Sequence, residues 1–428
     1  MTTSIMPSDA PALKNIQTRP TDRLARKFLF GILQKLKWGK ITFLEGTQRH
    51  DFGQTSSAYP LKATINVHHS RFYSKAILGG SIGTAEAYMS GLWSADDLST
   101  ALRIMALNRD SFERMDKGWS RLSAPLQRAV HFLRKNTRSG SRKNIGAHYD
   151  LGNDFYRLFL DETLTYSCGI FKSEGSSLQD ASLAKYDRIC RKLELTSADD
   201  VVEIGAGWGG FAIYAAQNIG CRVTATTISD EQFKLAQKRI AECGLADRIQ
   251  LVMKDYRDLK GTYSKLVSIE MIEAVGHHYL DAYFETCSRL LKPDGMMLLQ
   301  AITITDQVFE RHKRSVDFIK RYIFPGSCIP SIAAITSSIA RVTDLRLFHL
   351  EDITAHYAKT LACWREQFFE NIDMVKQLGY SEAFIRMWDF YLSYCEAGFA
   401  ERYIGNVQML FTKPMCRREP LIPDLTAG

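Results

Sequence analysis

The stretch VEIGAGWGG, residues 202–210, constrains the fold more than any other part of the sequence. Its apolar start predicts a buried strand, and Gly205, Gly207 and Gly209 follow at once. Glycines at this place let the backbone come close to a ligand at the start of the next helix. The G-x-G-x-G spacing differs from the G-x-G-x-x-G of dinucleotide binders, although Gly210 also satisfies that pattern. Because Glu203 lies inside the strand, S-adenosylmethionine (SAM) is the favoured ligand.

The residues after this loop alternate between apolar strands and amphipathic helices. Such alternation is typical of an α/β fold with a doubly wound, mostly parallel sheet, here of the Rossmann-like class I methyltransferase type. The helix that follows the fourth strand is predicted to stop at Pro293-Asp294-Gly295. From about 310 the chain reads as mostly helical, with one last strand-like run at 405–413. The further strands are predicted within 221–229, 249–255, 265–269 and 296–304.

Changes in composition divide the chain into parts. We expect a disordered start (1–20), a small N-terminal α+β domain (21–127), a basic linker (128–144), the catalytic domain (145–415) and a tail (416–428). The glycines of LGGSIG are read as tight turns within the N-terminal domain. The nine cysteines form no C-x-x-C pair, which predicts a reducing compartment, no disulfide framework and no structural zinc. Neither a secretory leader nor a membrane-spanning segment is expected.

The formal net charge of +8 is concentrated in residues 128–144, which contain six basic side chains and no acid. A second segment, 23–40, mixes Arg and Lys with apolar residues at helical spacing. One interpretation is an ordinary solvated helix face. Another is attraction to an anionic membrane, where each basic residue contributes roughly 1 kcal/mol. No motif supports nucleic-acid binding, so we expect no nucleic-acid partner.

In a doubly wound sheet the ligand lies outside the carboxyl ends of the strands. The stretch MIEAVGHHY, 271–279, follows such an end, and Glu273 is expected to face the site. His277 and His278 are adjacent, so their side chains should diverge on a regular helix or strand. There is no H-E-x-x-H spacing, and no metal is expected. Residues predicted at the rim are 205–209, 226–229, 255–256, 270–273 and 300–302.

Several motifs together resemble the cyclopropane fatty acid synthases and the related mycolic acid cyclopropane synthases. The resemblance covers about 145–415 in order, and its motifs are HYDLGNDFYRLFLDETLTYSCGIF, EIGAGWGG, VTATTISDEQ, KDYRDL, SIEMIEAVG and RYIFPGSCIPS. The family implies SAM-dependent methyl transfer to the cis double bond of a phospholipid acyl chain. The resulting carbocation loses a proton and closes a cyclopropane, or loses it elsewhere and gives a methylene- or methyl-branched chain. The N-terminal domain would then associate with lipid.

The resemblance also implies roles for particular residues. A bound bicarbonate would be the base, held by Glu273, Gln300 and Tyr357 and by the backbones of Cys168 and Ile302. Aromatic residues of 391–399, with Tyr322 and Phe324, would wall the acyl channel and favour the cation. The implied SAM residues are Tyr166, Ser167, Glu203, Gly205, Gly207, Gly209, Thr227, Gln232, Tyr256 and Arg257. Independently of the resemblance, Ser229 before Asp230-Glu231-Gln232 predicts a helix N-cap.

One departure from the family concerns the product. Gln300 stands where the typical synthase has His, and a Gln side chain cannot titrate. The leading interpretation is a cyclopropane product, and the alternative is a branched acyl chain. Two further hypotheses are a methyltransferase for a small soluble substrate and a lipid-binding protein with a vestigial SAM site. We expect a cytoplasmic protein at the inner face of the cytoplasmic membrane, and the sequence is compatible with a homodimer.

Overall fold

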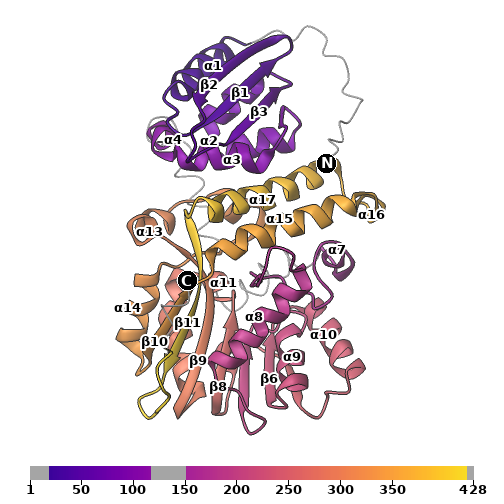
Figure 1. The fold of residues 1–428 in the computed structure, drawn as a ribbon, viewed down its shortest axis with the longest axis vertical. Helices are drawn as coiled ribbons and strands as arrows, with labels where there is room; N and C mark the ends of the chain where they lie inside the picture. The colour runs from indigo at the N-terminus through magenta and orange to yellow at the C-terminus, as the bar shows by residue number, and fades with distance from the viewer. Residues whose placement is uncertain (1–18, 117–150, 422–428) are drawn as a thin grey trace. The chain divides into compact units, whose positions relative to one another are not determined.

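The computed structural model describes residues 19–116 and 151–421 (Figure 1). The chain divides into two compact units. One unit contains Met1–Ser123 and Glu382–Phe390, and the other contains Ala124–Ser381 and Tyr391–Gly428. Within the described ranges, no helix is both long enough and apolar enough to cross a membrane. The basic segment 128–144 lies outside the described residues.

The first unit is a small α+β structure with a four-stranded sheet in the order β2-β1-β3-β4. The glycines expected to form tight turns lie instead within helix α2, which is kinked at Gly80 (φ 57°). A Cβ at Gly83 would lie 2.0 Å from the carbonyl oxygen of Lys75, so the kinked helix needs a glycine there. The elements are α1 (Pro20–Leu33), β1 (Gly39–Glu45), β2 (Gln48–Gln54), β3 (Lys62–Val67), α2 (Arg71–Met89), β4 (Trp93–Ala95), α3 (Leu98–Leu107) and α4 (Arg109–Asp116).

The second unit begins with helices and continues as a Rossmann-like sheet. Its first part comprises α7 (Asn153–Arg157), α8 (Leu178–Lys192), β5 (Asp200–Ile204), α9 (Gly210–Asn218), β6 (Arg222–Thr227), α10 (Asp230–Glu242), β7 (Ile249–Met253), the 3-10 turn η2 (Tyr256–Asp258), β8 (Tyr263–Ile269) and α11 (Ile272–Val275). Its second part comprises η3 (His277–Tyr279), α12 (Leu280–Leu290), β9 (Leu291–Ile304), α13 (Asp306–His312), the π-helix η4 (Ile319–Ile323), α14 (Ile332–Val342), β10 (Arg346–Asp352), α15 (Thr354–Glu370), α16 (Ile372–Gln377), the second half of α17 (Glu382–Ala400) and β11 (Ile404–Thr412). The first half of α17, Glu382–Phe390, belongs to the first unit.

The large sheet has seven strands in the order β10-β11-β9-β8-β5-β6-β7. Strands β5 to β9 pair in parallel, whereas β11 is antiparallel to both β9 and β10 (Figure 1). The predicted mostly parallel, doubly wound fold is confirmed. Strand β10 was not predicted. Its residues are only partly buried, so they lack the apolar run by which the inner strands were recognised.

Alternate residues of each strand face two separate hydrophobic cores. Val202 and Ile204 of β5 pack into one core with α12 and α14, and Val201 packs into the other with α8 and α9. Helix α12 ends at Leu290, before the predicted Pro-x-Gly stop, because residues 291–295 already belong to β9. Because β5 to β9 run in the same direction, their carboxyl ends lie side by side along one edge of the sheet, the edge at which all of these strands end.

Candidate functional site

The glycine loop joins β5 to α9 at the edge of the sheet where the parallel strands end. Gly205, Gly207 and Gly209 all have positive φ, at 92°, 52° and 84°. A Cβ at Gly205 would lie 2.9 Å from Cγ of Met271, so this glycine permits close packing against the end of β8. A Cβ at Gly207 would meet nothing within 4 Å, which leaves open space beside the loop.

The residues predicted to bind SAM lie along the same edge. Thr227 ends β6 and donates a hydrogen bond to Oε1 of Gln232 at 2.9 Å. Ser229 caps α10 by accepting from the backbone N–H of Gln232, as predicted. After β7, Arg257 forms an ion pair with Asp255 at 2.6 Å, and Tyr256 lies between these two residues. These groups follow the carboxyl ends of β6 and β7, and the glycine loop follows the carboxyl end of the neighbouring strand β5.

Glu203 lies in β5 just before the loop and is almost fully buried. Its Oε2 has no hydrogen-bond partner among the described residues. Burial raises the pKa of Glu203 to about 8. An unpartnered buried carboxyl oxygen beside an open glycine loop fits a polar ligand such as SAM. SAM would supply an electrophilic methyl group at this edge.

The segment containing Tyr166 and Ser167 lies against Tyr391, one of the predicted channel aromatics, and against Lys185, which the sequence analysis did not select. The Tyr166 hydroxyl is 2.8 Å from that of Tyr391. Ser167 accepts a hydrogen bond from Nζ of Lys185 at 2.6 Å, and Lys185 is fully buried in α8. Burial lowers the pKa of Lys185 to about 8, and the charge of Glu270 is the largest opposing influence. A lysine among the apolar positions of α8 was the available signal.

Glu270, directly after β8, is the centre of the predicted catalytic cluster. Its Oε1 accepts hydrogen bonds from the Cys168 backbone N–H at 3.0 Å, from Gln300 Nε2 at 2.8 Å and from Asn406 Nδ2 at 2.6 Å. Its Oε2 accepts from the Tyr357 hydroxyl at 2.6 Å. All four contacts use the carboxyl oxygens as acceptors, so they fix the position of this side chain.

The backbone at Glu270 is held in a costly conformation. Its φ is 49°, in the left-handed region, which costs an L-residue other than Gly about 1–2 kcal/mol. The Glu270 N–H donates to the carbonyl oxygen of Gln300 at 2.8 Å, so the turn is fixed against β9. Strain of this kind is often found at functional sites.

Glu273 occupies a different position from the one that the sequence analysis gave it. Its Oε1 accepts from the Ile302 N–H at 2.5 Å, while Cys168, Gln300 and Tyr357 donate to Glu270. The Oε2 of Glu273 has no partner among the described residues. Burial first, and then the charge of Glu270, raise the pKa of Glu273 to about 8. Its carboxyl group is therefore mostly protonated at neutral pH.

The five residues expected to bind bicarbonate thus do come together, but they surround two carboxyl groups. Glu270 follows the end of β8 and Glu273 lies in α11, and the two carboxyl groups accept from different donors. The sequence signal for Glu270 was its place directly after a buried strand, three residues before Glu273.

A chain of buried amides continues from Gln300 into the sheet. Gln300 and Gln408 are register partners on β9 and β11, and Gln408 Nε2 donates to Gln300 Oε1 at 3.0 Å. Gln408 Oε1 in turn accepts from Lys192 Nζ at 2.9 Å, and Lys192 also pairs with Glu351 at 2.6 Å. The ammonium group can only donate, so it fixes the orientation of both amides and directs Gln300 Nε2 toward Glu270. Asn406 and Gln408 could have been noticed as polar residues alternating along an otherwise apolar strand.

Aromatic rings surround Tyr357. Its ring stacks on Phe399 at a centroid separation of 4.2 Å, and Trp364 lies edge-on to it at 6.1 Å. Tyr166 packs on Trp364 at 5.1 Å, and Phe324 packs on Tyr391 at 6.2 Å. The faces of aromatic rings can stabilise a cation.

The predictions for His277, His278 and Cys168 can also be compared with the structure. His277 and His278 lie in a 3-10 turn with ring centroids only 3.8 Å apart, so the expectation that they diverge is wrong. Across residues 19–116 and 151–421, no group of three His, Cys, Asp or Glu residues could hold a metal ion. The Cys168 thiol is buried, and burial raises its pKa well above the ordinary value. The contact with Glu270 is made by the backbone N–H of Cys168.

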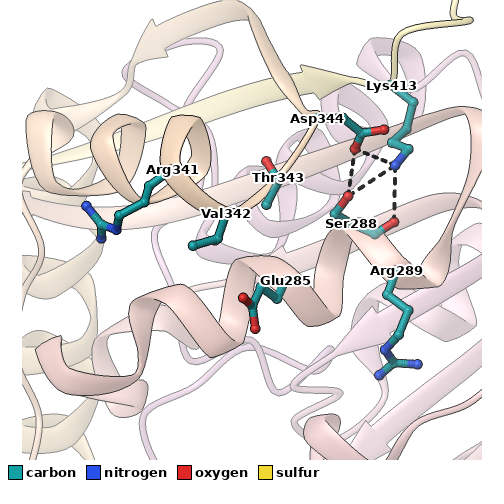
Figure 2. Close-up of a pocket in the computed structure, with 8 residues that line it drawn as sticks. All are labelled: Glu285, Ser288, Arg289, Arg341, Val342, Thr343, Asp344 and Lys413. Carbon is teal, nitrogen blue, oxygen red and sulfur yellow. Dashed lines mark hydrogen bonds and ion pairs between the residues drawn. The ribbon is translucent and has the colours of Figure 1, made fainter.

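A pocket of about 560 Å³ lies elsewhere on the second unit (Figure 2). It is lined by the ends of α12 and α14 and by Lys413, which follows β11. Since β11 is antiparallel to β9, this pocket lies at the edge of the sheet opposite the carboxyl ends of the parallel strands. Lys413 is paired with Asp344 at 2.5 Å, and Arg341 is paired with Asp281 at 2.5 Å. It is therefore separate from the Glu270 cluster.

Comparison with known proteins identifies the family. Residues 136–409 match the family model described as mycolic acid cyclopropane synthetase. The chain belongs to this family. It is 36% identical over 362 residues to a tuberculostearic acid methyltransferase of Mycobacterium tuberculosis, covering 83% of this chain and 84% of that protein. It is 35% identical over 354 residues to the cyclopropane-fatty-acyl-phospholipid synthase of Escherichia coli, covering 82% and 88%.

A solved structure supports the same assignment. The crystal structure of a mycolic acid cyclopropane synthase complexed with SAH and CTAB is similar with a TM-score of 0.60 and 31% identity. The matched region covers 64% of this chain and 98% of the chain in that crystal structure. The present chain is accordingly a SAM-dependent enzyme of the methyltransferase type, as the sequence predicted.

Proposed function

We propose that this enzyme transfers a methyl group from SAM to the cis double bond of an unsaturated phospholipid acyl chain and closes a cyclopropane. The observation that carries the proposal is the Glu270 carboxyl group, which accepts hydrogen bonds from four donors directly after β8. An alkene is a poor nucleophile, so the reaction needs a strong electrophile, a site without water and a base.

The aromatic lining suits the cation that methyl transfer creates. The ring of Tyr357 stacks on Phe399 and Trp364 lies edge-on to it, so aromatic ring faces lie beside the hydroxyl that donates to Glu270. Such faces stabilise a cation by their quadrupole and also exclude water, which would otherwise capture it. Family membership and the similarity to a cyclopropane-fatty-acyl-phospholipid synthase support this substrate class.

A second candidate is the same methyl transfer followed by proton loss elsewhere, which gives a branched acyl chain. Two observations favour it. Gln300 donates a hydrogen bond to Glu270 but cannot itself accept a proton, and one of the similar proteins is named a tuberculostearic acid methyltransferase. The two candidates share every step up to the loss of the proton.

Product analysis tests both candidates. The purified protein is incubated with SAM and liposomes of monounsaturated phospholipid, and the fatty acid methyl esters are examined by mass spectrometry. A gain of one CH2 unit supports the proposed function, and a product that then resists mild hydrogenation is the cyclopropane. A product that takes up hydrogen is an unsaturated branched chain. No gain with liposomes, but methylation of a soluble acceptor, would contradict the phospholipid substrate.

We also propose that the enzyme works at an anionic membrane surface. In the first unit, Leu24 and Phe28 lie four residues apart on α1 and are 67% and 46% exposed. Two exposed apolar side chains on one face of a helix with basic neighbours are suited to insertion at a lipid surface. The basic segment 128–144 adds charge in the sequence.

Liposome co-sedimentation tests this attachment. The double variant Leu24→Asp, Phe28→Asp should bind anionic liposomes at least about tenfold more weakly, whereas Met415→Asp, which alters another exposed apolar residue, should bind normally. Added salt should weaken binding of the unmodified protein. Binding that is insensitive to salt, lipid charge and the double substitution would contradict the proposal.

A further inference from the structure

The donors expected to hold bicarbonate already hold a carboxylate of the protein itself. The Cys168 N–H, Gln300 and Tyr357 all donate to Glu270. Bicarbonate bound to the same donors would need the space that the Glu270 carboxylate fills. The resemblance and the structure therefore disagree about the base.

We propose that the Glu270 carboxylate is the base of the reaction and replaces bicarbonate, so that this enzyme needs no bicarbonate for turnover. The inference rests on the proposed function, because it concerns the proton that is lost after methyl transfer. It also assigns a catalytic role to a residue that the family resemblance did not select.

The hydrogen bonds identify the oxygen that accepts the proton. Oε1 of Glu270 accepts three hydrogen bonds, from Cys168, Gln300 and Asn406. Oε2 accepts one, from Tyr357, and so retains an unshared lone pair. Oε1 therefore anchors the carboxylate, and Oε2 takes the proton.

The backbone at this position supports a role for the side chain. Glu270 has a φ of 49°, a conformation that Gly would adopt without strain. The chain tolerates this strain at the end of β8, where the carboxylate reaches donors from β9, β11 and α15. Glu273 is less suited to be the base, because its pKa is raised to about 8 and its carboxyl group is mostly protonated at neutral pH.

The proton transfer balances without any further reactant. In the carbocation, the electron pair of a C–H bond on the added methyl group forms the new C–C bond that closes the ring. The proton moves to Oε2 of Glu270, the positive charge on carbon is neutralised, and the carboxylate becomes a carboxylic acid. In the branched alternative, a neighbouring C–H bond supplies the electron pair and the same oxygen accepts the proton.

Glu270→Gly is the decisive variant. It removes the carboxylate, relieves the positive φ and leaves four donors facing an anion-sized space. Activity is measured with SAM and monounsaturated phospholipid liposomes, in buffer stripped of carbon dioxide and in the same buffer with about 20 mM bicarbonate or formate. Glu194→Gly is the matched control, because Glu194 also has a positive φ (50°) but lies before β5, at the opposite edge of the sheet.

The expected results separate the two possible bases. The unmodified enzyme and Glu194→Gly should keep their rates within about twofold when bicarbonate is removed. Glu270→Gly should lose at least about 100-fold without bicarbonate and recover at least about tenfold with it, while formate, a weaker base, restores less. An unmodified enzyme that requires bicarbonate, or a Glu270→Gly variant that is fully active without it, would overturn the inference.

A thermal melting measurement decides the question of the anion site without activity. Bicarbonate or formate should raise the melting temperature of Glu270→Gly by about 2–4 °C and leave the unmodified protein and Glu194→Gly unchanged. If the unmodified protein has no activity on lipid, the proposed function fails, and melting still shows whether Glu270 fills the anion site. Equal stabilisation of all three proteins would contradict the inference that Glu270 fills the anion site.

Discussion

Tyr357 of α15 donates a hydrogen bond of 2.6 Å to Oε2 of Glu270, a residue 87 positions earlier in the chain at the end of β8. The phenol is buried, and burial together with the charge of Glu270 raises its pKa well above the ordinary value. Tyr357 therefore stays protonated and can only support the carboxylate as a donor. This contact joins α15 to the residue that follows β8.

Tyr357→Phe should lower kcat by about 10- to 100-fold, because a hydrogen bond to a charged group contributes about 1.5–3 kcal/mol. The ring and its stacking on Phe399 would remain, so SAM affinity measured by calorimetry should not change. Tyr263→Phe, which removes an exposed hydroxyl from the start of β8, is the control and should leave kcat unchanged. Equal kcat values in the two variants would remove Tyr357 from the catalytic cluster.

Glu270→Gln should abolish turnover across the pH range in which the protein is folded. The amide has the size of the carboxylate but cannot accept a proton, and loss of a general base costs about 10²–10⁴-fold. Unlike Glu270→Gly, this variant leaves no room for an anion, so added bicarbonate should not restore activity. Turnover within about threefold of the unmodified enzyme would show that another group removes the proton.

Gln408→Leu tests whether the amide chain orients Gln300. The substitution leaves Gln300 Oε1 without its donor and Lys192 without one acceptor, so the Gln300 amide can turn away from Glu270. We expect kcat to fall by about three- to tenfold with an unchanged KM for SAM, and the free energy of unfolding to fall by about 1–3 kcal/mol. Met409→Leu, at the next position of β11, preserves volume and should leave kcat unchanged. A loss of stability without any fall in kcat would limit Gln408 to a structural role.

The stability of the protein should fall as pH rises from about 4.5 to about 8. Glu203 and Glu273 both have pKa values raised from 4.5 to about 8, so across this range each binds a proton in the folded state and none when unfolded. Each group then lowers the free energy of unfolding by roughly 1 kcal/mol per pH unit. In urea unfolding at pH 6 and pH 8, Glu273→Gln should show a smaller pH dependence than the unmodified protein. Glu174→Gln, which alters an exposed carboxylate, is the control and should show the same dependence as the unmodified protein.

Gly207→Ala should weaken SAM binding by at least about tenfold while the protein remains folded. The added Cβ would meet no protein atom within 4 Å, so it would intrude only on the space beside the loop. Gly244→Ala is the matched control, since Gly244 has a similar positive φ (68°), has equally open surroundings and lies after α10. Calorimetric titration with SAM measures both variants. Normal SAM affinity in Gly207→Ala would place the ligand elsewhere.

The sequence by itself determined the parallel part of the large sheet, the glycine loop and the family. Strands β5 to β9 and their helices were predictable because buried parallel strands are continuous apolar runs, and the runs alternate with amphipathic helices. Ser229 was predictable as a helix cap because capping is decided by the next three residues. These features depend on local order along the chain, which a sequence displays directly.

Tertiary structure alone decided which glutamate receives the donors. Glu270 and Glu273 are three residues apart in one motif, and nothing local distinguishes their roles. The positive φ at Glu270 and the register of β9 with β11 bring Gln300 and Asn406 to that carboxylate, and α15 brings Tyr357. Glu273 is left buried, with the pKa of its carboxyl group raised. These contacts join residues that are 30, 87 and 136 positions apart, so they could not be worked out from the order of residues in the motif.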